Sequence, residues 1–94
     1  MYTRKIGSNR GKRRLWLEGA ILLESGFTHK ASFRVTATDK GLRIELSADG
    51  NRNIAGTQSR PIVDINSDTV LGLFDIGSTV NIVSPSAGVL EVIK

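Results

Sequence analysis

The chain has 94 residues, 39% hydrophobic and 23% charged, a composition typical of one small globular domain. It contains no cysteine, which excludes both a disulfide framework and a thiolate metal site. No apolar run approaches the roughly 20 residues of a membrane span, and the basic N-terminus lacks the apolar stretch of a secretory signal. We therefore expect a cytoplasmic protein with no membrane partner.

The positive charge is concentrated near the N-terminus. Residues 1–14 carry six basic and no acidic residues, a charge of +6, whereas residues 15–94 carry seven basic and nine acidic residues, a charge of −2. A concentrated basic segment on a near-neutral body is typical of a surface that binds polyanions. The alternative interpretation is a solvated strand face that only improves solubility.

The chain contains an internal repeat with an offset of 48 residues. The matched pairs are Arg4 and Arg52, Ile6 and Ile54, Lys12 and Arg60, Leu15 and Val63, Leu17 and Ile65, Leu22 and Val70, Leu23 and Leu71, Leu42 and Leu90, and Ile44 and Val92. In the middle of each half the offset is 47, which pairs Phe27 with Phe74 and Val35 with Ile82. A repeat of this length indicates two similar structural units. Because a unit of about 45 residues buries too little apolar surface alone, we expect residues 2–47 and 50–94 to share one core in a single domain.

Alternation of apolar and polar residues predicts a mainly β fold. The predicted strands are 14–17, 31–37 and 42–46 in the first half and 61–65, 79–83 and 89–93 in the second. Turns are predicted at 38–41 and 84–88, where Gly, Pro, Asp and Ser gather, and a turn or short linker at 48–52 joins the halves.

One stretch in each half does not alternate, and we predict a helix of about two turns for each. The first is 19–25, which Gly26 would end because glycine commonly terminates helices. The second is 67–73, with Asn66 or Ser67 as its N-cap. Each half is therefore expected to run strand, strand, short helix, strand, strand.

The segment from Arg14 to Phe27 reads Arg-Leu-Trp-Leu-Glu-Gly-Ala-Ile-Leu-Leu-Glu-Ser-Gly-Phe, a basic residue and a strand followed by a short helix and a Gly-Phe corner. With the hairpin that follows, it resembles the swapped-hairpin barrels of the SpoVT/AbrB-like superfamily, which includes the SymE and MazE relatives. The segment from Arg60 to Phe74 is a degenerate copy that lacks the Gly-Phe corner and contains Gly72. Two such units normally intertwine as a dimer. The resemblance, which covers about residues 2–93, therefore implies a pseudo-two-fold barrel with two short helices, either as a pseudo-dimeric monomer or as a homodimer of such chains.

The resemblance also implies that basic residues of the first strand, and of the loop before the second, contact nucleic acid. The matching positions are Arg4, Lys5, Arg10, Lys12, Arg13 and Arg14 in the first half, with Arg52 and Arg60 in the second. Independently of the family, arginine on a paired β-ribbon can reach phosphates or a guanine edge in the major groove. Residues 56–59 take the place of residues 8–11 without charge. We therefore expect one strong and one weak basic surface, with largely electrostatic, salt-dependent affinity for duplex DNA.

Trp16 lies beside the basic run, and alternation places Leu15 and Leu17 on one face and Trp16 on the other. Trp16 either covers the end of the core or stacks on a nucleobase. His29, the only histidine, is predicted to lie on a surface loop, since no cysteine accompanies it as a metal ligand. The scattered carboxylates form no paired acid signature, and no nucleophile has a neighbouring base, so neither an enzyme nor a bound cofactor is expected.

These features predict a small DNA-binding protein that acts as a transcriptional or architectural regulator. Two alternatives remain open from the sequence. The first is a protein-interaction module, such as a phage- or plasmid-encoded inhibitor or a toxin–antitoxin-related protein. The second is a SymE-like toxin that acts on RNA, for which the chain offers no catalytic residues.

Overall fold

The computed structural model describes residues 2–94 and confirms the mainly β prediction, with 53% of residues in strands and 5% in one helix. The elements of the first half are β1 (Tyr2–Lys5), β2 (Gly7–Asn9), β3 (Lys12–Glu18), α1 (Ala20–Glu24), β4 (Ser32–Ala37) and β5 (Gly41–Leu46). Those of the second half are β6 (Arg52–Asn53), β7 (Ala55–Gly56), β8 (Pro61–Asn66), β9 (Thr79–Ser86) and β10 (Val89–Ile93). No helix in these residues has the length and apolarity that a membrane crossing requires.

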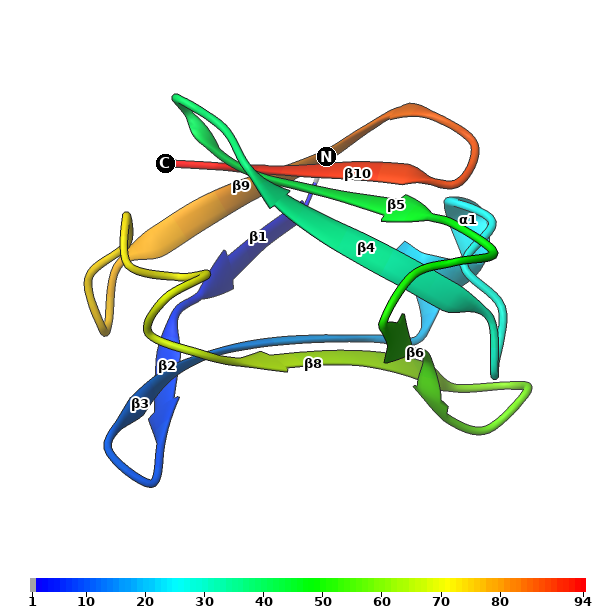
Figure 1. Ribbon diagram of the computed structural model, residues 1–94, viewed down its shortest axis with the longest axis horizontal. Helices are drawn as coiled ribbons and strands as arrows, with labels where there is room; N and C mark the ends of the chain where they lie inside the picture. Colours follow the sequence, from blue (N-terminus) through cyan, green and yellow to red (C-terminus); the bar gives the residue numbers. More distant parts are fainter. Residues whose placement is uncertain (1) are drawn as a thin grey trace.

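The strands form two antiparallel sheets. The six-stranded sheet has the order β1-β9-β10-β5-β4-β6, and the four-stranded sheet has the order β2-β3-β8-β7. The chain passes from one sheet to the other at Ile6, between β1 and β2, and again at Ile54, between β6 and β7. The six-stranded sheet curls over the four-stranded one, so the molecule is barrel-like (Figure 1).

The two halves exchange their first strands. β1 of the first half pairs with β9 of the second, with Arg4 opposite Val80. β6 of the second half pairs with β4 of the first, with Arg52 opposite Phe33. Because Arg4 and Arg52 are repeat equivalents, the two edge ladders have equivalent registers, and each half supplies the edge strand beside the other half's strands in the six-stranded sheet.

The registers define a pseudo-two-fold axis. In the β3–β8 ladder Trp16 lies opposite Asp64, and in the β10–β5 ladder Arg43 lies opposite Glu91. Both pairs are 48 residues apart, which is the offset of the sequence repeat. A residue lies opposite its own repeat equivalent only where a two-fold axis passes, so the axis runs through the centres of these two ladders.

One apolar cluster fills the space between the sheets and draws on both halves. Its largest side chains are Phe27, Phe33 and Phe74, all almost completely buried. Leu15 and Leu17 point into the cluster as their alternation predicts.

The second predicted helix is wrong. Residues 67–73 form consecutive turns, although Ser67 Oγ accepts a hydrogen bond from Val70 N at 3.2 Å as an N-cap would. A single helical turn is closed by a bond from Leu71 N to Ser67 O at 3.0 Å. Gly72 follows, and glycine in a helix costs about 1 kcal/mol relative to alanine, so the turn does not propagate.

Candidate nucleic-acid interface

The β2–β3 hairpin projects from the body of the molecule, at the lower left of Figure 1. β2 is the edge strand of its sheet and pairs with β3 through Gly7 opposite Arg14 and Asn9 opposite Lys12. The two turn residues, Arg10 and Gly11, both have positive φ, at 55° and 78°, as the tight type I′ hairpin turn requires. We call residues 7–14 the basic arm.

The tip of the basic arm carries free positive charge. The side chains of Arg10 and Lys12 are exposed, and neither forms an ion pair within residues 2–94. Lys5, at the end of β1 and two residues before the arm begins, is likewise exposed and forms no ion pair in the described chain. These three side chains are therefore available to a polyanion.

Arg13 anchors the base of the arm to the second half. Its Nη1 donates to Asp68 Oδ1 at 3.0 Å, its backbone N donates to the same oxygen at 2.9 Å, and its Nε donates to Phe74 O at 2.7 Å. The backbone bond first, and the guanidinium second, lower the pKa of the Asp68 carboxyl below its ordinary value. The partners of Arg13 are 55 and 61 residues away, so the sequence pattern gave no sign of them.

Arg14 is also paired. Its Nε and Nη2 donate to the two carboxylate oxygens of Asp64, both at 2.9 Å, which is the two-bond geometry that suits arginine best. This hydrogen bonding raises the pKa of Arg14 above its ordinary value. The guanidinium lies over the Trp16 ring, 4.5 Å from its centroid. Trp16 is 38% exposed on the outer face of the four-stranded sheet, so it packs on Arg14 and does not cover the end of the core.

The other predicted residues lie apart from the arm tip. Arg4 lies in β1, donates to Thr3 O at 2.7 Å and lies over the Tyr2 ring at 5.5 Å. Arg52 is half-buried in β6. Arg60 is 73% exposed, and its Nε is 4.0 Å from Glu18, a contact of little energetic weight at such exposure. The structure thus brings together four predicted residues on the arm, with Lys5 just before it, and separates Arg4, Arg52 and Arg60 from the arm tip.

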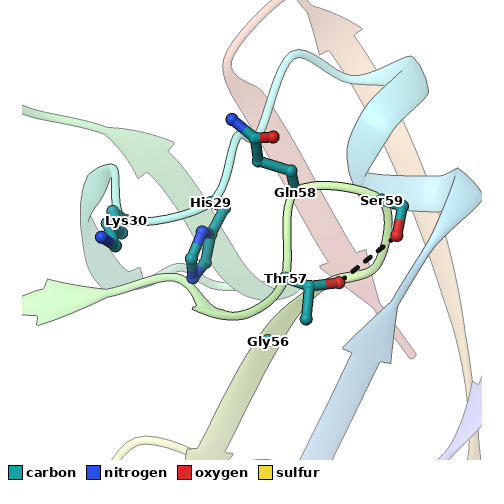
Figure 2. Close-up of a pocket in the computed structure, with 6 residues that line it drawn as sticks. All are labelled: His29, Lys30, Gly56, Thr57, Gln58 and Ser59. Carbon is teal, nitrogen blue, oxygen red and sulfur yellow. Dashed lines mark hydrogen bonds between the residues drawn. The ribbon is translucent and has the colours of Figure 1, made fainter.

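A surface hollow lies at the tip of the β7–β8 connection, which is the repeat equivalent of the basic arm (Figure 2). It has a volume of about 620 Å³ and is wide open to solvent. Its lining residues are His29, Lys30, Gly56, Thr57, Gln58 and Ser59. His29 lies on a loop, as predicted, and Lys30 follows it at a position that no sequence motif marked as functional.

Within residues 2–94 no group of three or more potential ligand side chains is arranged to hold a metal ion. Comparison of the chain with protein-family models, with curated proteins and with solved structures gives no match.

Proposed function

We propose that the chain binds duplex DNA through the basic arm and acts as a transcriptional or architectural regulator. The observation that carries this proposal is the pair of exposed cations, Arg10 and Lys12, which form no ion pair within residues 2–94 and lie at the tip of a projecting two-stranded hairpin. A two-stranded β-ribbon fits the roughly 12 Å width of the major groove. Cations at its tip would meet phosphates or the acceptor edge of guanine.

The remaining predicted residues take supporting roles in this proposal. Arg13 and Arg14 fix the arm, because their guanidinium groups already bind Asp68 and Asp64. Lys5 extends the positive surface from the arm base into β1. Arg4, Arg52 and Arg60 contribute to the field around the body without direct contact.

We further propose that the fold is a swapped-hairpin barrel of the SpoVT/AbrB-like kind in which one chain supplies both units. The exchange of β1 and β6 between the halves and the two repeat-related pairs on the axis support this assignment. The missing second helix departs from the expected pattern. A pseudo-dimer of this kind would act as a monomer, with one arm richer in charge than the other.

The binding is expected to be electrostatic. Non-specific protein–DNA complexes have dissociation constants of about 10⁻⁴ to 10⁻⁶ M at physiological salt. The logarithm of the association constant falls with the logarithm of salt concentration by about 0.9 for each phosphate contacted. The slope of this line, which we call the salt slope, therefore reports how many phosphates the protein contacts. The decrease in salt slope in a variant reports how many of these contacts the variant has lost.

The test is a titration of random duplex DNA with intrinsic Trp16 fluorescence as the readout, over a range of salt concentrations. Trp16 is the only tryptophan and lies beside the arm base, stacked on Arg14. The Arg10→Gln/Lys12→Gln variant removes both tip charges. The matched control, Lys40→Gln/Lys94→Gln, removes the same charge at the opposite side of the molecule, where Lys94 N bonds to Lys40 O.

We expect the arm variant to lose about 2 units of salt slope and most of its affinity, and the control to lose much less. Equal losses in both variants would mean that net charge alone drives binding, and the arm would then not be the site. A wild-type protein that binds no duplex at low salt would remove the proposal. In that case single-stranded RNA and then a protein partner are the next ligands to test.

A further inference from the structure

Lys30 has an unusual backbone conformation. Its φ is 73°, in the left-handed region that residues other than glycine, asparagine and aspartate rarely adopt. Its repeat equivalent at the offset of 47 is Gly77, with a φ of 88°. The two make the same bond, since Lys30 N donates to Ile54 O at 3.0 Å and Gly77 N donates to Ile6 O at 2.7 Å. One half therefore fills this position with glycine, which fits without strain, and the other fills it with lysine.

The charge at the two ends of the four-stranded sheet is arranged differently. At the first end the arm tip is cationic, through Arg10 and Lys12, and the segment equivalent to 29–30 is the uncharged pair Ile76 and Gly77 from the second half of the chain. At the second end residues 56–59 are uncharged, Arg60 takes the place of Lys12, and the facing loop carries Lys30 from the first half of the chain. The second end therefore keeps one cation of its arm and gains another on the loop that lines the same hollow.

The hollow between these segments suits a phosphate group. The side chains of Thr57, Gln58 and Ser59 offer hydroxyl and amide donors on one side of the hollow, and Lys30 offers an ammonium group on the other side, beyond His29 (Figure 2). The Thr57 and Ser59 hydroxyl oxygens are 3.4 Å apart, so both can turn toward one acceptor. No carboxylate lines the hollow.

We infer that this hollow is a second phosphate-binding site for the same duplex, with Lys30 as its main charged contact. This inference rests on the function proposed above. The basic arm and the β7–β8 connection lie at opposite ends of the β3–β8 pair, both in the lower part of the view in Figure 1. The longest dimension of the molecule is 30 Å, less than the roughly 34 Å of one duplex turn, so one duplex can reach both sites.

The test compares single substitutions in the same duplex titration. Lys30→Asn removes the charge and keeps a residue that tolerates the left-handed conformation. We expect it to lower the salt slope by about 1 unit without lowering Tm. Lys30→Arg should keep the slope of the wild type. Lys40→Asn, a lysine removed from an exposed turn, serves as the control and should leave the slope nearly unchanged.

The outcomes separate the two proposals. If Lys30→Asn keeps the wild-type slope while Arg10→Gln/Lys12→Gln loses it, the second site is wrong and the arm stands. If Lys30→Asn and Lys40→Asn lose slope equally, Lys30 acts only through net charge, and the second site is again wrong. If the wild-type protein binds no duplex, both proposals fall.

Discussion

Leu17 of β3 lies directly opposite Val63 of β8, and both side chains are completely buried. The two residues come from different halves of the chain, and their ladder is one of the two through which the pseudo-two-fold axis passes. The apolar faces of the two halves therefore meet in one core. Neither half holds a complete core of its own.

Leu17→Ala should lower the free energy of unfolding by about 2–5 kcal/mol, because a buried leucine leaves a cavity that the surrounding sheets fill only in part. The measurement is urea denaturation followed by Trp16 fluorescence and by far-UV circular dichroism. We expect one transition with the same midpoint by both probes. Leu23→Ala, at a side chain 47% exposed, is the control and should change stability by no more than about 0.5 kcal/mol. Two separate transitions would show that the halves unfold independently.

Lys30→Gly should stabilise the protein by up to about 1 kcal/mol. The substitution removes the strain of a lysine in the left-handed region, and this gain exceeds the cost of the extra conformational entropy that glycine gives the unfolded chain. The reciprocal change, Gly77→Ala, should destabilise it by about 1–2 kcal/mol. No atom lies within 4 Å of a Cβ built on Gly77, so this loss would come from the backbone alone. Chemical denaturation of both variants measures these two changes in the free energy of unfolding. A destabilised Lys30→Gly variant would mean that the lysine side chain itself supports the fold.

Asp68→Asn should destabilise the protein at neutral pH and have little effect in acid. The hydrogen bonds from Arg13 lower the pKa of Asp68 in the folded state. A carboxyl with a lowered folded pKa contributes stability above its unfolded pKa, and that contribution disappears as the pH falls through the folded value. The difference in Tm between wild type and variant should therefore have its largest value at pH 6–7 and become smaller below about pH 4.

Asp39→Asn is the control for this measurement, since Asp39 is exposed in the turn before β5 and forms no ion pair within residues 2–94. Its Tm should follow that of the wild type across the pH range. A Tm difference for Asp68→Asn that stays constant down to pH 3 would contradict the role given to the Arg13 bonds.

The strands were predictable because their signals are local. The alternation in 42–46 places Leu42 and Ile44 in the core and Arg43 toward solvent, which the structure confirms. Gly26, with a φ of 83°, follows the end of α1 as predicted. The repeat also anticipated which residues would occupy equivalent ladder positions, since matched residues share a structural environment.

The errors arose where distant contacts decide the outcome. Residues 67–73 were predicted to form a helix, but Arg13, 55 residues before Asp68 in the chain, binds the Asp68 carboxylate in what are consecutive turns. Arg14 was expected to contact nucleic acid, and its two bonds to Asp64, 50 residues away, are not visible in any local pattern. Lys30 was overlooked because its significance lies in a backbone angle that side-chain matching does not reveal. Each of these depends on tertiary structure that no local pattern encodes.

DNA binding through the basic arm is tested most directly by an NMR titration of ¹⁵N-labelled protein with a short random duplex. We expect the largest chemical-shift changes on residues 7–14, smaller ones on 29–30 and 56–60, and none on the turn at 38–41. Raising the salt concentration should reverse these changes together. Changes confined to 38–41 or spread evenly over the surface, or no change at low salt, would contradict the account.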